Sequence, residues 1–233
     1  MTYTNTLWTR LTALLWAIAG VCFVLYPAIR PFSDESTLQG AQAFATSAWI
    51  LAHSLAMVGF ILLTLGLLGV YGRLCETAAG RLGLAALVVT WIGVGLTLPY
   101  YGAEAFALHA VGQEALRQNN VELLVTLTNS IRYGAAIWLF GAGLLAIAVG
   151  TILFAIAIWR SGILAEWSGI PLAVGFALFI PQFYTSQPVR VGHGLLVMVG
   201  CWLLAWSMVS RRTGEDSARL GSQLGSPSRS AKN

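Results

Sequence analysis

Ionisable residues are rare inside the apolar segments of this chain, and several fall in one stretch, Pro99 to His109. Glu104 is the carboxylate placed furthest inside an apolar run. Tyr100 and Tyr101 precede it by four and three residues, so a helix would present all three on one face. A carboxylate in apolar surroundings must be protonated, paired or hydrated. Glu104 is therefore predicted to donate or accept a proton beside aromatic walls.

His53 is the second candidate catalytic residue, because it lies about two turns inside another apolar run and is a natural partner for a carboxylate. Arginines at the ends of other runs supply positive charge for the polar head of a ligand. The predicted ligand-binding residues are Tyr100, Tyr101, Arg132, Arg190, His193 and Trp49. For Glu104 and His53 the alternative is a purely structural ion pair or hydrogen bond between helices.

No metal site is predicted, because the chain has no H-E-x-x-H motif and its three cysteines have no paired spacing. If the protein holds a metal or a haem, the ligands would be His53, His109 and His193. His109 does not share the face of Glu104, since five residues advance a helix well past one full turn. The sequence leaves the cofactor open.

Six long apolar runs must position these residues, each close to the roughly 20 residues that a bilayer-spanning helix needs. Charged residues make up 9% of the chain and hydrophobic residues 57%, which excludes a water-soluble fold. The predicted fold is an all-α bundle of six transmembrane helices, at residues 8–29, 46–72, 82–109, 133–159, 164–183 and 191–209.

The lysines and arginines predict that both termini are cytoplasmic. On that topology the inside segments hold Arg10, Arg73, Arg81, Arg160, Arg211, Arg212, Arg219, Arg229 and Lys232, and the outside segments hold Arg30, Arg117, Arg132 and Arg190. Residues 1–210 form the predicted membrane domain, and residues 211–233 a disordered basic cytoplasmic tail.

The two connections on the predicted outer side contain sequence that is compatible with helices. In the first, Asp34 and Glu35 lie where a helix N-terminus favours acids. The second, residues 113–129, carries leucines among charged residues. It is predicted either to lie on the outer leaflet as an amphipathic helix or to cap the bundle.

Three motifs give the chain a resemblance to a family. They are R-P-x-x-D-E-S/T at Arg30 to Ser36, A-W-x-x-A-H at Ala48 to His53, and Y-Y-G-A-E-A-F-x-L-H at Tyr100 to His109. With them the chain resembles a group of uncharacterised bacterial multi-pass membrane proteins of actinobacterial type. The resemblance covers most of the chain and implies no activity.

Together these patterns predict a multi-pass protein of the bacterial plasma membrane, with a polar pocket in the outer half of the bilayer. It would bind or transform a hydrophobic small molecule or lipid through the intramembrane carboxylate Glu104. The alternatives are a redox protein with haem or metal, a non-catalytic membrane subunit, and a transporter. Membrane lipid is the expected partner, nucleic acid is not, and the oligomeric state is left open.

Overall fold

The computed structural model describes the backbone of residues 6–224 and the side chains of residues 7–210, and every regular element in that range is a helix. Within it, five helical segments are long and apolar enough to cross a membrane. They contain α1 (Thr6–Ile29), α3 (Ser47–Leu74), α4 (Gly80–Gly102) continuing into α5 (Leu108–Gln118), α7 (Ala135–Ser161) and α9 (Gln187–Leu224). These segments support a multi-pass membrane protein.

The predicted sixth span, residues 164–183, does not form one long helix. It contains the 3₁₀ turn η2 (Glu166–Gly169), the short helix α8 (Ile170–Ala177) and the 3₁₀ turn η3 (Pro181–Tyr184). Pro181 explains the early end of α8, because a proline ring clashes with the carbonyl of the residue four positions earlier, here Ala177. Eight residues of α-helix are too few to cross a bilayer alone.

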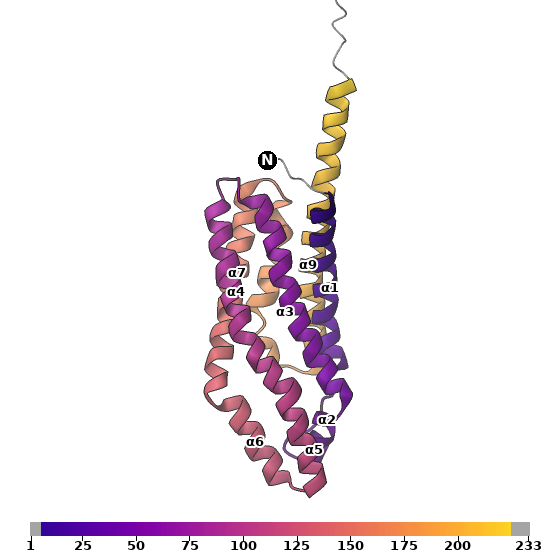
Figure 1. Ribbon diagram of the computed structural model, residues 1–233, viewed down its shortest axis with the longest axis vertical. Helices are drawn as coiled ribbons and strands as arrows, with labels where there is room; N and C mark the ends of the chain where they lie inside the picture. Colours follow the sequence, from indigo (N-terminus) through magenta and orange to yellow (C-terminus); the bar gives the residue numbers. More distant parts are fainter. Residues whose placement is uncertain (1–5, 225–233) are drawn as a thin grey trace, which may run out of the picture.

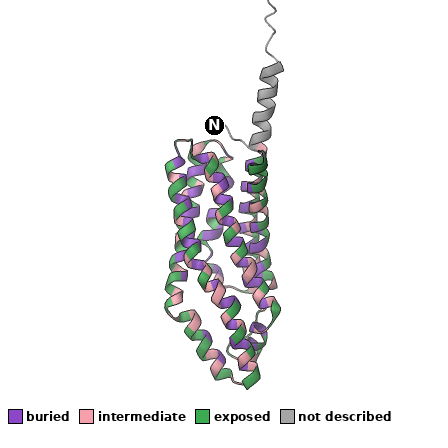
Figure 2. Cartoon of the chain, in the orientation of Figure 1, coloured by how far each residue is buried: buried purple, intermediate pink, exposed green. Residues whose placement is uncertain are grey.

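The long helices run side by side, and the start of α1 and the end of α9 lie at the same end of the bundle (Figure 1). Helices α4 and α7 approach most closely where glycines face each other. A Cβ atom on Gly93 would lie 2.7 Å from the carbonyl oxygen of Gly143, so this crossing has no room for a side chain. Buried residues follow the facing sides of the helices (Figure 2).

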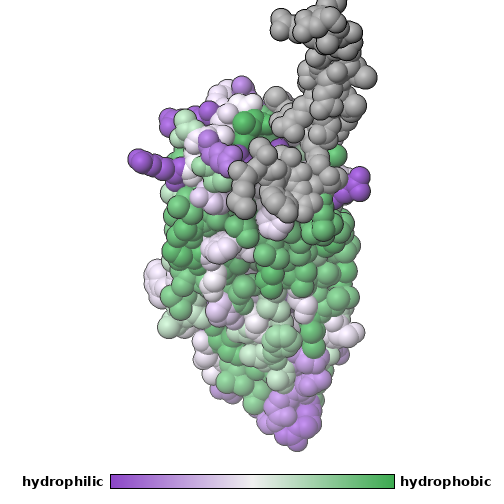
Figure 3. All heavy atoms as spheres, turned by 45° about the horizontal axis from the view of Figure 1, so that its top comes forward, coloured by the Kyte–Doolittle hydropathy of each residue, from purple (hydrophilic) through white to green (hydrophobic). Residues whose placement is uncertain are grey.

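A second, smaller core lies beyond the other end of the bundle, in a cap made of α2 (Leu38–Phe44), α5 and α6 (Val121–Tyr133) (Figure 1). It is built from Ala41, Phe44, Trp49, Leu108, Val111, Ala115 and Leu124. Of the two arrangements predicted for residues 113–129, the chain adopts the cap. Figure 3 shows apolar surface around the middle of the molecule and hydrophilic surface at both ends.

The predicted cytoplasmic tail, residues 211–233, lies wholly beyond the described side chains. Helix α9 continues to Leu224, and residues 225–233 lie outside the described residues, as do residues 1–5. The division at residue 210 and the disorder of residues 211–233 therefore stay predictions.

Candidate functional site

Glu104 lies in an irregular turn between α4 and α5. This π-helical turn, η1 (Ala103–Ala107), is marked by the N–H of Leu108 donating to the carbonyl of Ala103, five residues earlier. Helix α4 continues through Pro99, and the irregular turn begins four residues after it. A π turn widens a helix by one residue and often occurs at functional sites. Here it carries the buried Glu104, whose exposed fraction is 7%.

The carboxylate of Glu104 is held by Arg132 from the last turn of α6. Arg132 Nε donates to one carboxylate oxygen at 2.6 Å, and Nη2 donates to the other at 2.9 Å. Such a two-pronged contact fixes both position and orientation of the acid. Arg132 was predicted as a ligand-binding residue, and in the structure its closest charged partners are carboxylates of the protein itself.

Arg132 also joins Glu104 to a second acid. Its Nη1 donates to Glu35, and Arg30 Nη2 donates to the other oxygen of Glu35 at 2.8 Å. Glu104, Arg132, Glu35 and Arg30 therefore alternate in sign, and we call them the charge network. They connect α6, η1, the end of α1 and the loop before α2, so the network ties the cap to the bundle.

The charge network keeps Glu35 of the loop and Arg132 of the cap in their charged forms. Burial opposes ionisation of Glu35, but the guanidinium groups of Arg132 and Arg30 outweigh it, and the pKa of this carboxyl lies below its ordinary value. Burial also opposes the charged form of Arg132. Glu104 and Glu35 outweigh that effect, and the pKa of Arg132 lies above its ordinary value.

Helix α3 contacts Glu104 from the other side. Trp49 Nε1 donates to the backbone carbonyl of Glu104 at 2.6 Å, and His53 Nδ1 donates to the carbonyl of Trp49 at 2.8 Å. The remaining ring nitrogen of His53 lies 3.7 Å from Glu104 Oε2, which exceeds hydrogen-bond distance. Because Nδ1 carries a proton, a neutral His53 turns the lone pair of Nε2 toward the carboxylate.

A cavity of about 420 Å³ lies against the charge network. Arg30, Arg132, Arg190, Glu35 and Glu104 supply its charged lining. The other lining residues are Tyr26, Phe32, Ser33, Tyr100, Tyr101, Tyr133, Ile137, Phe140, Phe183 and Tyr184. A volume of this size is ordinary for a small-molecule site.

An apolar groove of about 500 Å³ adjoins this cavity on the side of α7. The two spaces share Ile137, Phe140, Phe183 and Tyr184. Trp138 in the groove is 80% exposed and Tyr184 88% exposed. Exposed aromatic side chains with a polar edge are typical of the boundary between lipid and water.

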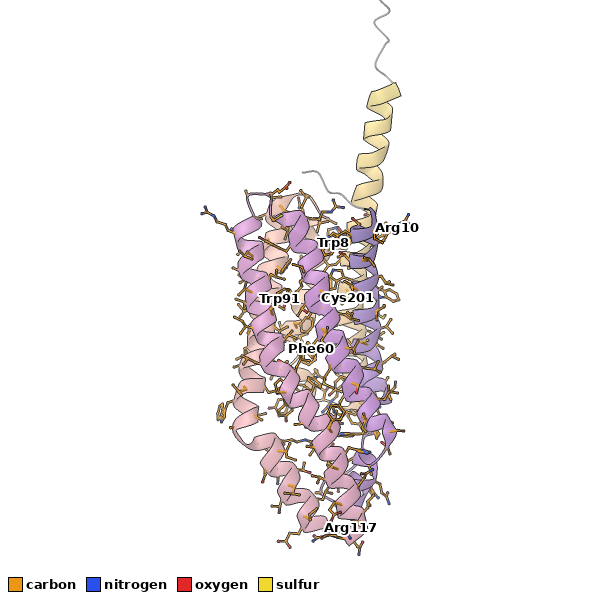
Figure 4. All side chains as sticks on the ribbon, viewed as in Figure 1. Trp8, Arg10, Phe60, Trp91, Arg117 and Cys201 are labelled. Carbon is orange, nitrogen blue, oxygen red and sulfur yellow. The ribbon has the colours of Figure 1, made fainter. Side chains whose placement is uncertain are left out.

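The charge network lies at one end of the long apolar helices. Arg10 and Arg30 are 20 residues apart, as are His53 and Arg73. Twenty helical residues span about 30 Å, the thickness of the hydrocarbon layer. With one face at the level of Arg10 and Arg73, the other therefore falls at the level of Arg30 and His53. Figure 4 shows Arg10 and Arg117 at opposite ends of the molecule.

The predicted site residues divide into two sets. Glu104, His53, Trp49 and Arg132 contact one another, and Tyr100, Tyr101 and Arg190 line the adjoining cavity. Neither tyrosine forms a hydrogen bond with Glu104, although both were predicted to share its helix face. The Tyr101 hydroxyl has no hydrogen-bond partner among the described residues, and the Tyr100 ring stacks on Phe140 at 4.1 Å.

The other two histidines are engaged elsewhere. His109 Nδ1 donates to the carbonyl of Phe44 at 2.8 Å, and its Nε2 accepts from Gln113 at 3.0 Å. His193 Nε2 donates to the carbonyl of Gly175 at 2.7 Å. Over the described part of the chain, no three His, Cys, Asp or Glu side chains are grouped to hold a metal.

Glu35 is the site residue that the sequence did not single out. It was interpreted as an acid near a helix start, but α2 begins later, after Thr37 caps it through the N–H of Gln39. Its position five residues after Arg30, across Pro31, was the available signal. No periodicity connects that loop with Arg132, which is 97 residues away.

Comparisons of the chain with protein-family models, with curated proteins and with solved structures find no match. The resemblance carried by the three sequence motifs therefore stays a prediction. Fold and site geometry are the basis for the function proposed below.

Proposed function

We propose that this multi-pass membrane protein binds an amphiphilic lipid or hydrophobic small molecule, with the polar end in the cavity and the apolar part in the groove beside α7. The observation that carries the proposal is that the two spaces adjoin, with four side chains lining both. One space is rimmed by charges and the other is almost wholly apolar. Only an amphiphile matches both at once.

Glu104 has an organising role in this proposal. Both of its carboxylate oxygens accept hydrogen bonds from Arg132, and its backbone carbonyl accepts one from Trp49. A carboxylate whose two oxygens are both engaged by one guanidinium group is held in position by the protein itself. Binding is thus better supported than a reaction in which Glu104 and His53 act as acid and base.

The proposed setting is the bacterial plasma membrane, with the charge network near the outer face and both termini of the chain cytoplasmic. Arg73, Arg81 and Arg160 support this orientation, because they lie in the helix turns that flank the short connections at the end opposite the network. Short cytoplasmic connections carry an excess of arginine and lysine.

Native mass spectrometry on protein purified in a mild detergent tests the proposal. We expect the wild type to retain a co-purified amphiphile, and Gly141→Leu to lose it. Gly141 lines the groove, and a Cβ atom there meets nothing within 4 Å, so leucine fills the groove without disturbing the fold.

Gly95→Leu is the matched control. Gly95 on α4 is equally unobstructed and lines neither space. This variant should retain the amphiphile as the wild type does. A wild type without bound amphiphile, or equal retention in Gly141→Leu, would contradict the proposal and favour a structural membrane subunit.

A further inference from the structure

The cavity carries more positive than negative charge. Its ionisable lining consists of the three arginines Arg30, Arg132 and Arg190 and the two acids Glu35 and Glu104. In the charge network Arg30 and Arg132 balance the two acids, and Arg190 has no acidic partner among them. A single unmatched positive charge at the edge of a low-dielectric region attracts an anion.

Arg190 is held in place by groups that do not neutralise it. Its Nε donates to the carbonyl of Thr185 at 3.1 Å, and Nη2 donates to the carbonyl of Phe183 at 2.5 Å. The Phe32 ring lies 5.1 Å from the guanidinium carbon. Among the side chains that the structure describes, Arg190 forms no salt bridge with a carboxylate. It is a fixed cation with donor capacity to spare.

Tyr101 is an independent sign of a ligand in the same cavity. Its side chain is 2% exposed, it lines the cavity, and its hydroxyl lacks a hydrogen-bond partner in the described part of the chain. The Tyr26 hydroxyl is a close polar neighbour that interacts with the Tyr101 hydroxyl, but the two do not meet the distance and angle of a regular hydrogen bond. A buried hydroxyl without a partner costs free energy unless something else satisfies it.

We infer that the cavity binds the head group of a membrane lipid with one net negative charge, with Arg190 as the charge partner and the Tyr101 hydroxyl as a hydrogen-bond donor. This inference rests on the proposed function, and it adds the chemical class of the ligand. One negative charge balances the lining, and an anionic oxygen accepts from both side chains. The adjoining groove favours an acylated anion over a free one.

The test compares binding of three probes to the full chain in detergent by native mass spectrometry and by thermal shift. The probes are phosphatidylglycerol, whose net charge is −1, phosphatidylcholine, whose phosphate charge is offset by its choline cation, and inorganic phosphate. We expect the wild type to prefer phosphatidylglycerol over phosphatidylcholine by about tenfold, because the choline cation would bring a further positive charge into a cavity that already has one in excess. Inorganic phosphate should neither bind measurably nor displace the lipid.

Two variants test whether Arg190 and Tyr101 contact the head group. Arg190→Gln should abolish the preference for phosphatidylglycerol. Tyr101→Phe should weaken phosphatidylglycerol binding while leaving the thermal midpoint of the lipid-free protein unchanged or higher, because it removes an unpartnered hydroxyl. A hydroxyl that mattered only for folding would lower that midpoint. Arg117→Gln, which changes an exposed arginine far from the cavity, is the control.

The outcomes separate this inference from the proposed function. Equal binding of both lipids, together with loss of both in Gly141→Leu, would overturn the anionic head group and leave amphiphile binding standing. Displacement by inorganic phosphate would overturn the lipid and favour a soluble anion. Undiminished phosphatidylglycerol binding by Tyr101→Phe would remove Tyr101 from the site, and no lipid binding at all would overturn both proposals.

Discussion

The crossing of α4 and α7 and the charge network use polar groups in opposite ways. At the crossing, the hydroxyls of Thr90, Thr97 and Thr151 donate to carbonyls four residues earlier in their own helices, at 2.8, 2.8 and 2.9 Å. In the network, the charged side chains of Arg132 and Arg30 reach acids on other elements. Close packing therefore holds the crossing of α4 and α7 together, and ion pairs hold the charge network together.

The difference explains where a ligand site can form. Glycine-lined crossings bring backbones together and leave no space, as the contacts around Gly93 show. Charged side chains are long, and pairing them across a gap holds elements apart. The cavity therefore lies beside the charge network and not between α4 and α7.

Breaking the network at its centre should have the largest effect. Arg132→Gln leaves Glu104 without its ionic partner in a buried place, and Glu35 keeps only Arg30. Removing one partner of a buried ion pair typically costs about 3–5 kcal/mol. We expect a loss of that size in the free energy of unfolding, measured by SDS titration in mixed micelles.

A second substitution tests the cause of that loss. Adding Glu104→Gln to Arg132→Gln removes the uncompensated charge and should restore part of the stability. Arg117→Gln breaks a contact of the same chemistry, but Arg117 and Glu114 are exposed, and no measurable change is expected. Equal losses in Arg132→Gln and Arg117→Gln would contradict the distinction between the two regions.

Filling the helix crossing should have a smaller but clear effect. A Cβ atom on Gly150 would lie 2.1 Å from Thr90 Oγ1 and 2.9 Å from the backbone nitrogen of Thr90, so Gly150→Val must push α4 and α7 apart. Overpacking of this kind costs about 1–3 kcal/mol. The same titration measures it, with Gly141→Val on the same helix as the unobstructed control.

The five long helices could be predicted because each is encoded locally, in an apolar run of sufficient length. The runs at residues 8–29 and 46–72 match α1 and α3 to within two residues at each end. The run at 164–183 passed the same test of composition but breaks into shorter elements at Pro181. Hydropathy does not register the loss of a backbone donor or the clash of a proline ring.

The candidate site was predictable only in part, because many of its contacts join residues that are far apart in the sequence. The cost of burying a charge singled out Glu104, and Arg132, which was predicted to bind a ligand, is its ion-pair partner. Glu35 was missed because an acid in a loop carries no such cost until folding brings the cap over it. The π turn at Ala103–Ala107 was missed because it shifts side chains by one residue without a signature in composition.

Acid should lower the stability of the protein by less than either of the preceding substitutions. The pKa of Glu35 is lower in the folded protein than its ordinary value, because Arg132 and Arg30 outweigh the effect of burial. The unfolded chain therefore takes up this proton first. The stabilisation is complete above the ordinary carboxyl pKa of about 4.3 and is lost as the pH falls through the lower folded value.

Thermal midpoints of the wild type and of Glu35→Gln, measured from pH 7 down to pH 3, detect this loss. The wild type should lose stability below about pH 4, by at most about 1.4 kcal/mol per pH unit for this one group. Glu35→Gln should start lower and fall less steeply, so that the two curves converge in acid. Glu122→Gln removes an exposed carboxyl on α6 outside the network and should run parallel to the wild type. If Glu35→Gln also stayed parallel to the wild type, Glu35 would not be held ionised by the two arginines, and the charge network would end at the pair of Glu104 and Arg132.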